Sequence, residues 1–251
     1  MRLLFLFCLS LAAALPAAAL TPRELDSIGR RVWQNECGGT REGLTSWNVG
    51  ENFASLGIGH FIWYPKGVNG PFDESFPGLV KFLEANGVAV PGWLDGDCPW
   101  STREEFIAAS KGPKLTALRD LLADEVALQA RFLALRMEKA LPKMLAAARP
   151  ARRTVVRENF ERLAATPAGT FALIDYVNFK GEGTKETERY HGEGWGLLQV
   201  LENMGNGASP AAAFARSADE VLTRRVKNAP AERKEERWLP GWRNRVRAYG
   251  G

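Results

Sequence analysis

The chain has 251 residues, of which 45% are hydrophobic and 25% are charged. This composition is typical of a globular protein and excludes a disordered, collagenous or multi-span membrane protein. The formal net charge of +4 is far below the concentrated positive excess of a nucleic-acid-binding protein, so we expect no nucleic-acid partner.

Residues 1–19 have the pattern of a secretory signal peptide. A basic start at Met1-Arg2 is followed by an uncharged run over 3–15 and by a small-residue cleavage site over 16–19. An uncleaved membrane anchor is the alternative, because the apolar run approaches the length of a membrane span. We expect a cleaved signal peptide and therefore a periplasmic or secreted protein without stable membrane insertion.

Two cysteines, Cys37 and Cys98, remain in the predicted mature chain over 20–251. Export would place them in a compartment that permits disulfides. We therefore predict a Cys37–Cys98 disulfide, which would close a loop of about 60 residues and stabilise the fold by roughly 4 kcal/mol. The alternative is a pair of buried free thiols.

Helix signals follow one another along the mature chain. Thr21, Pro22 and Glu24 form a capping box with proline at the first helical position, and Gly38-Gly39 predicts the end of that helix. One long helix is expected over 114–141. Further helices are expected to start at Ser101, Pro150, Thr166 and Ser209. In total, we expect at least eight helices.

Residues 45–64 differ from the rest because they are rich in Gly, Ser and aromatic residues with a period near two, which predicts a small β-ribbon. Its core-facing side is expected to carry Ala54, Leu56 and Ile58. Its other side is expected to carry Glu51, Phe53, Ser55, Gly57 and Gly59, and these glycines would let a ligand approach the backbone closely. The predicted fold class is therefore α+β, mainly α: one domain over 20–251 with a small antiparallel β-wing.

Glu36 stands at the end of the first predicted helix, where the negative end of the helix dipole favours the protonated carboxyl group. Trp33, one turn earlier, is expected to cover this carboxyl with apolar surface. A carboxyl that keeps its proton near neutral pH can protonate the leaving oxygen of a glycosidic bond. Glu51 and Ser55 are expected to activate or position water on the opposite side of the sugar.

Simpler readings compete with these assignments. A glutamate at a helix end is most often a solvated charge. Glu42 is a second candidate carboxylate, but its neighbour Arg41 favours a surface ion pair. His60 is a second candidate catalytic group, but a lone histidine at a strand end more often has a structural hydrogen-bonding role.

Glu36 followed by Ser55-Leu56-Gly57-Ile58-Gly59-His60 resembles the signature of phage-type lysozymes, in which a catalytic glutamate ends the first helix and a Thr-x-Gly-Ile-Gly-His strand follows. The resemblance covers about residues 33–61. It implies a lysozyme-like fold and hydrolysis of a β-1,4-linked amino-sugar polymer, with Glu36 as the general acid and Ser55 in the place of a water-positioning threonine. The chain departs from the pattern at Val49, where the family has an aspartate. The spacing from Glu36 to His60 is also a few residues longer.

The second half of the chain is expected to supply the other wall of a cleft. Segments 175–183 and 190–196 mix aromatic residues, glycines and hydrogen-bonding groups, a mixture that suits sugars. Asn178, Tyr190 and Gln199 are the predicted sugar contacts. The basic stretch over 216–247 is expected to be a solvated helix face with internal ion pairs, with adhesion to a polyanionic cell wall as the alternative.

The sequence therefore predicts an exported, monomeric glycoside hydrolase that cleaves peptidoglycan with Glu36 as the acid and with water held by Ser55 and Glu51. No metal or organic cofactor is expected, because no Cys/His cluster has ligand spacing. One alternative is a hydrolase for chitosan or de-N-acetylated peptidoglycan, which an acidic cleft with Glu51, Glu182 or Glu193 would favour. A lytic transglycosylase and a non-catalytic wall-binding protein are the others.

Overall fold

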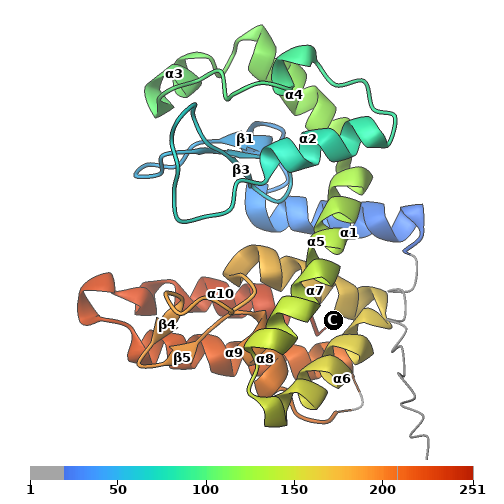
Figure 1. The fold of residues 1–251 in the computed structure, drawn as a ribbon, viewed down its shortest axis with the longest axis vertical. Coiled ribbons are helices and arrows are strands. Elements are labelled where there is room, and N and C mark those ends of the chain that lie inside the picture. The colour runs from blue at the N-terminus through green and yellow to red at the C-terminus, as the bar shows by residue number, and fades with distance from the viewer. Residues whose placement is uncertain (1–19, 208, 251) are drawn as a thin grey trace, which may run out of the picture.

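The computed structural model describes residues 20–207 and 209–250 (Figure 1). The predicted signal peptide over 1–19 lies outside the described residues. Within them, the helices are α1 (Pro22–Cys37), α2 (Phe76–Ala85), α3 (Arg103–Ala108), α4 (Pro113–Asp124), α5 (Val126–Ala147), α6 (Arg153–Ala164), α7 (Pro167–Lys180), α8 (Leu197–Asn203), α9 (Pro210–Asn228) and α10 (Leu239–Arg247).

Two small antiparallel sheets complete the described part of the fold. The first has the order β1-β2-β3, with strands β1 (Thr45–Ser46), β2 (Ala54–Leu56) and β3 (Phe61–Trp63). The second pairs β4 (Arg189–Tyr190) with β5 (Glu193–Gly194). The predicted class, α+β and mainly α with at least eight helices and a small antiparallel wing, is confirmed. No helix in the described ranges is long and apolar enough to cross a membrane.

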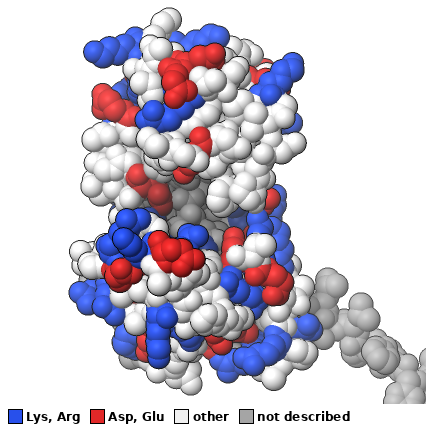
Figure 2. All heavy atoms as spheres, turned by 90° about the vertical axis from the view of Figure 1, so that its left-hand side faces the viewer, with Lys and Arg blue, Asp and Glu red and all other residues white. Residues whose placement is uncertain are grey.

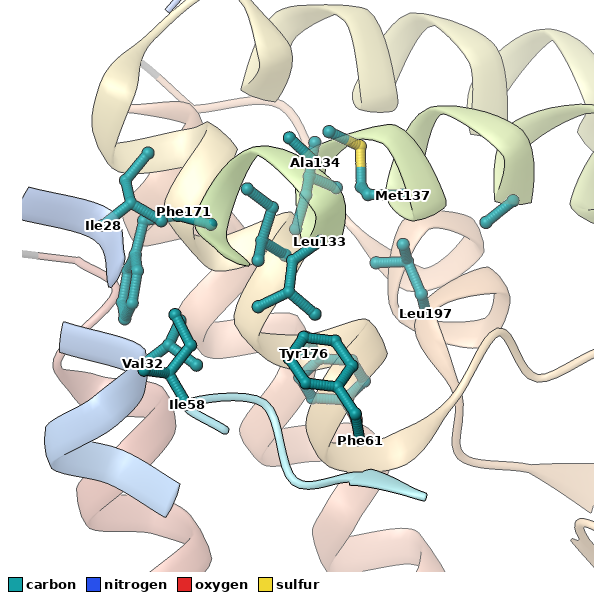
Figure 3. Packing of buried hydrophobic residues seen from close by; sticks show 14 of the residues in the cluster. Ile28, Val32, Ile58, Phe61, Leu133, Ala134, Met137, Phe171, Tyr176 and Leu197 are labelled. Carbon is teal, nitrogen blue, oxygen red and sulfur yellow. The ribbon is translucent and has the colours of Figure 1, made fainter. Parts of the chain in front are cut away.

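The elements form two halves joined by α5 (Figure 1). The three-stranded sheet and α2, α3 and α4 make one half, and α6 to α10 with the β4-β5 pair make the other. Buried side chains from both halves meet around α1, α5 and α7. Figure 3 shows Val32 of α1, Ile58 of the β2–β3 turn and Leu133 of α5 close to Phe171 and Tyr176 of α7. The β2–β3 turn is therefore inserted into the core between the two halves.

The first helix begins and ends as predicted. The Thr21 hydroxyl accepts a hydrogen bond from the Glu24 backbone, and the Glu24 carboxylate accepts one from the Thr21 backbone. Gly38 ends the helix with φ 62°, a left-handed conformation that glycine adopts without strain. Gly29 lets α1 approach α5 closely, because a Cβ there would lie 2.6 Å from Val126 Cγ1. These contacts set where the last turn of α1, with Glu36, lies.

The single long helix predicted over 114–141 is wrong, because the chain breaks between α4 and α5 at Glu125. A side chain in the first turn of α5 makes hydrogen bonds across this break. The buried Gln129 side chain donates to the Leu122 and Glu125 carbonyls, and so satisfies groups at the end of α4. The helix starts predicted at Thr166 and Ser209 are confirmed, because these residues cap α7 and α9.

Two further starts lie close to their predicted positions. Thr102 rather than Ser101 caps α3, and its side chain accepts a hydrogen bond from the Glu105 backbone. Pro150 begins a short 3-10 helix, Pro150–Arg152, that leads directly into α6.

The β-ribbon is buried on both sides. Ala54, Leu56 and Ile58 are 0% exposed, as predicted for the core-facing side. The prediction that the opposite side forms an open, glycine-lined surface is wrong, because Phe53, Ser55, Gly57 and Gly59 are also buried. The two glycines instead make room for α5: a Cβ on Gly57 would lie 2.4 Å from Gln129 Oε1, and one on Gly59 would lie 3.1 Å from Leu133 Cδ2.

The predicted Cys37–Cys98 disulfide is also wrong, because both cysteines are buried free thiols. The two thiols have different partners. Cys37 Sγ lies 3.6 Å from the Gly57 carbonyl oxygen, whereas Cys98 Sγ donates to the Trp100 carbonyl at 3.4 Å and its backbone bridges to Pro65.

The buried amide of Gln129 gives a direct test of how the ribbon is held. It accepts a hydrogen bond from the Ile58 backbone at 3.0 Å and is 0% exposed. We expect Gln129→Leu to cost about 1–3 kcal/mol in the free energy of unfolding, because the Ile58 N–H and the Leu122 carbonyl lose the hydrogen bonds that the Gln129 amide makes to them. Urea denaturation measures this loss. Gln34→Leu on the exposed side of α1 is the control and should change stability by less than about 0.5 kcal/mol; equal effects of the two variants would contradict the assignment.

Candidate active site

Glu36 lies where the two halves of the molecule meet. Its side chain is 16% exposed and is contacted from three other elements. Asn178 Nδ2 of α7 donates to Glu36 Oε1 at 3.2 Å, and Arg245 Nη2 of α10 donates to the same oxygen. Nδ1 of His60, in the β2–β3 turn, lies 3.7 Å from Glu36 Oε2. The carboxyl group is therefore held by groups from both halves of the chain.

Arg245 is held in place by Asp175, a carboxylate that is 0% exposed. Arg245 Nε donates to Asp175 Oδ2 at 2.8 Å, and Nη2 donates to Oδ1 at 2.8 Å. Tyr249 donates its hydroxyl to Oδ2 at 2.5 Å, and Asn35 Nδ2 donates to Oδ1 at 3.1 Å. Both oxygens of the buried carboxylate are thus satisfied, as a stable buried ion pair requires.

The pKa values of Arg245 and Tyr249, two of the donors to Asp175, are both raised. Burial lowers the pKa of Arg245, but the hydrogen bonds and charge of Asp175, together with the charge of Glu36, raise it further, so that it ends above its usual value. Burial and the charge of Asp175 raise the pKa of Tyr249. Arg245 is therefore a cation and Tyr249 a hydrogen-bond donor near neutral pH.

His60 is placed between Glu36 and Cys37. One ring nitrogen faces the Glu36 carboxylate, and the other, Nε2, lies 3.6 Å from Cys37 Sγ. Burial and the charge of Glu36 raise the pKa of the Cys37 thiol to about 12. Since the thiolate is the reactive form, Cys37 is not an activated nucleophile despite its histidine neighbour.

Trp33, which the sequence predicts to cover Glu36, is held at the turn that follows α1. Its indole N–H donates to the Thr40 carbonyl at 2.9 Å. The hydrogen-bond and ion-pair contacts of the Glu36 carboxyl group come from Asn178, Arg245 and His60.

The predicted water-positioning residues lie on the ribbon. Ser55 is 4% exposed, pairs with Ser46 and Ile62 through its backbone, and makes no side-chain hydrogen bond within the described ranges. Glu51 is half-buried in the β1–β2 turn, where its carboxylate accepts a hydrogen bond from Asn48 at 3.1 Å. No described contact joins Glu51 to Glu36.

The three predicted sugar contacts have different surroundings. Asn178 belongs to the Glu36 network. Tyr190 donates its hydroxyl to the buried Glu235 carboxylate at 2.9 Å. Gln199 is 7% exposed, and its amide bridges the Gly196 N–H and the Gly183 carbonyl, so it holds two loops together rather than facing a ligand.

Sequence reasoning missed Asp175, Arg245 and Tyr249. Asp175 carried a signal, because it is a lone carboxylate within an apolar helical run and therefore needs a buried cation. Arg245 was counted only as part of the basic stretch over 216–247. Several arginines of that stretch are used in internal ion pairs, as expected.

Among the residues that the structure describes, no group of three or more His, Cys, Asp or Glu side chains is arranged to hold a metal ion. Comparisons of the chain with protein-family models, with curated proteins and with solved structures find no match.

The Asp175–Arg245 pair predicts a large change in stability. Asp175→Asn preserves the shape of the side chain but leaves the Arg245 cation without its buried partner. We expect a loss of about 3–5 kcal/mol in the free energy of unfolding, measured by chemical denaturation. Asp120→Asn is the matched control, because Asp120 is 54% exposed in its ion pair with Arg41 and should cost less than about 1 kcal/mol. A loss below about 1 kcal/mol for Asp175→Asn would show that the pair does not hold α10 against α7.

Proposed function

We propose that the protein hydrolyses β-1,4 glycosidic bonds of peptidoglycan, with Glu36 as the general acid. The observation that carries this proposal is the asymmetry of the Glu36 carboxyl group. Oε1 accepts hydrogen bonds from Asn178 and Arg245, whereas Oε2 accepts none from the described residues and lies 3.7 Å from His60 Nδ1. Oε2 is therefore the oxygen that can carry a proton and give it to a leaving sugar oxygen.

The charges around Glu36 suit this proton transfer. Once Oε2 has given up its proton, the carboxylate is stabilised by the hydrogen bonds of Arg245 and Asn178 to Oε1. Asp175 balances the charge of Arg245, so Glu36 faces a nearly neutral ion pair rather than an isolated cation.

The shape of the molecule supports a polymeric substrate. Figure 2 shows a hollow between the two halves, with acidic and basic side chains on both of its sides. Glu36 is held by residues from both halves, and the proposal requires that a chain lying along this hollow brings a bond between two sugars to the carboxyl group.

Water would attack from the ribbon side. The Ser55 hydroxyl has no described hydrogen-bond partner, so it is available to bind a water molecule. Glu51, from the same ribbon, is the only acidic residue of β1–β3 and their turns available as a base or electrostatic stabiliser. Its carboxylate is held only by Asn48 among the described side chains.

A preference for cationic chitosan has less support. It would need an acidic cleft, but Glu182 is paired with Lys143 at 3.0 Å and Glu193 with Arg224 at 3.5 Å. These pairs reduce the negative charge that would attract a free amino sugar.

Glu36→Gln should abolish the release of reducing ends from purified peptidoglycan, because the amide cannot donate the proton that the leaving oxygen needs. Glu42→Gln makes the same chemical change at an exposed position and should leave the rate unchanged. The thermal unfolding of all three proteins is compared in parallel. Activity retained by a folded Glu36→Gln protein would remove Glu36 as the acid.

Ser55→Ala should lower kcat about 5–150-fold with little change in KM, because it removes one hydrogen bond to the attacking water. Ser46→Ala, on the neighbouring strand, controls for loosening of the sheet. Mass spectrometry of the products provides the second measurement. Products with 1,6-anhydro ends and an unchanged rate in Ser55→Ala would contradict hydrolysis and indicate a lytic transglycosylase instead.

A further inference from the structure

Lys180, the last residue of α7, lies two residues after Asn178 and beside the Glu36 network. Its Nζ is 3.9 Å from the centre of the Phe179 ring and 3.6 Å from the centre of the Trp242 ring. The faces of aromatic rings carry partial negative charge and support a cation. In the described part of the chain, no carboxylate lies within ion-pair distance of this ammonium group.

The neighbouring arginines differ from Lys180 in this respect. Arg245 lies 4.2 Å from the Phe179 ring centre and is paired with Asp175 and Glu36. Arg225 lies 5.0 Å from the Trp242 ring centre and is paired with Glu235, which is itself 0% exposed. Each arginine at these rings therefore has a carboxylate of its own, and Lys180 has none.

Burial lowers the pKa of Lys180 to about 6, and the charges of Arg225 and Arg245 act in the same direction. Glu235 and Glu36 oppose this shift. Lys180 is therefore largely uncharged above pH 7 when nothing is bound. An anion placed against Nζ would raise this pKa, and binding would then take up a proton.

The surface beside Lys180 suits a sugar. Trp238 is 37% exposed, and its ring centre lies 5.9 Å from that of Trp242. Half-exposed aromatic rings stack on the apolar faces of sugars. An anionic group on a sugar ring could thus reach Lys180 while the ring lies against the tryptophans.

We propose that Lys180 binds a carboxylate carried by the glycan, in a subsite completed by Trp242 and Trp238. This inference rests on the proposed function, because it places the carboxylate on the sugar chain that Glu36 would cleave. In peptidoglycan, the carboxylate is either the lactyl group of the muramic acid or a carboxylate of the peptide attached to it. The subsite would bind such a chain in preference to neutral chitin and would oppose binding of cationic chitosan.

The test measures binding by isothermal titration calorimetry in the Glu36→Gln background, which prevents turnover by the proposed mechanism. The probes are a peptidoglycan tetrasaccharide with free lactyl carboxylates, its neutral alanine-amide derivative, its derivative with an acidic dipeptide, and neutral chitotetraose. Lys180→Met retains an apolar chain against the two rings and removes the ammonium group. Lys180→Arg retains a cation that is charged throughout the pH range.

With Lys180 present, we expect one of the two anionic probes to bind at least about 10-fold more tightly than both neutral probes, with uptake of about one proton at pH 7.5. The probe that shows this preference identifies the lactyl or the peptide carboxylate as the group bound. Lys180→Met should lose the preference and the proton uptake while binding the neutral probes as before. Lys180→Arg should keep the preference without the proton uptake.

Equal affinity for anionic and neutral probes, or a preference that survives in Lys180→Met, would overturn the subsite. Hydrolysis of peptidoglycan by the wild-type protein is measured separately. Hydrolysis without a preference for the anionic probes contradicts only the subsite. A preference without hydrolysis contradicts only the proposed function.

Discussion

The buried ion pair of Asp175 with Arg245 constrains both the C-terminal half of the chain and the candidate active site. Asp175 is fully buried and accepts hydrogen bonds from Arg245, Tyr249 and Asn35. A buried carboxylate with a missing partner is strongly destabilising, so α1, α7 and the end of the chain must meet in one arrangement. The ion pair with Asp175 fixes the position of the Arg245 guanidinium group, and from that position it donates to Glu36. The geometry of the site is therefore a consequence of satisfying a charge inside the core.

The position of the β2–β3 turn is fixed by its packing against α5. Gly57 and Gly59 allow α5 to approach the β2–β3 turn, and the Gln129 amide then binds the Ile58 backbone. The turn carries His60 to within 3.7 Å of Glu36. Glycines that suggested room for a ligand thus serve packing, and that packing is what brings the histidine to the carboxyl group.

Local chemistry made much of the fold predictable from the sequence. Thr21, Thr166 and Ser209 each begin a helix because their side chains satisfy free backbone N–H groups, a requirement that the neighbouring residues alone reveal. The break at Glu125 could not be predicted in this way, because it depends on the Gln129 amide and on packing against the ribbon.

The candidate site was predictable only where neighbouring residues indicated it. Glu36 was selected from its position at a helix end before a glycine-rich ribbon, and the structure places Asn178, a second predicted residue, in contact with it. Asp175 and Arg245 are 70 residues apart, and neither belongs to a motif that would join them. The expected Cys37–Cys98 bridge failed because an even cysteine count says nothing about distance, and burial among apolar groups stabilises both free thiols.

The surroundings of the Glu36 carboxyl group also differ from what the sequence indicated. An unfavourable helix end and an apolar cover from Trp33 would keep the carboxyl protonated by making its charge costly. The structure instead places two hydrogen-bond donors on Oε1, whereas Oε2 accepts no hydrogen bond from the described residues and lies 3.7 Å from His60 Nδ1. A costly charge favours holding the proton, whereas a stabilised charge favours releasing it. In the proposed hydrolysis, Glu36 would therefore depend on Arg245 and Asn178 to hold the carboxylate that remains once the proton has passed to the leaving oxygen.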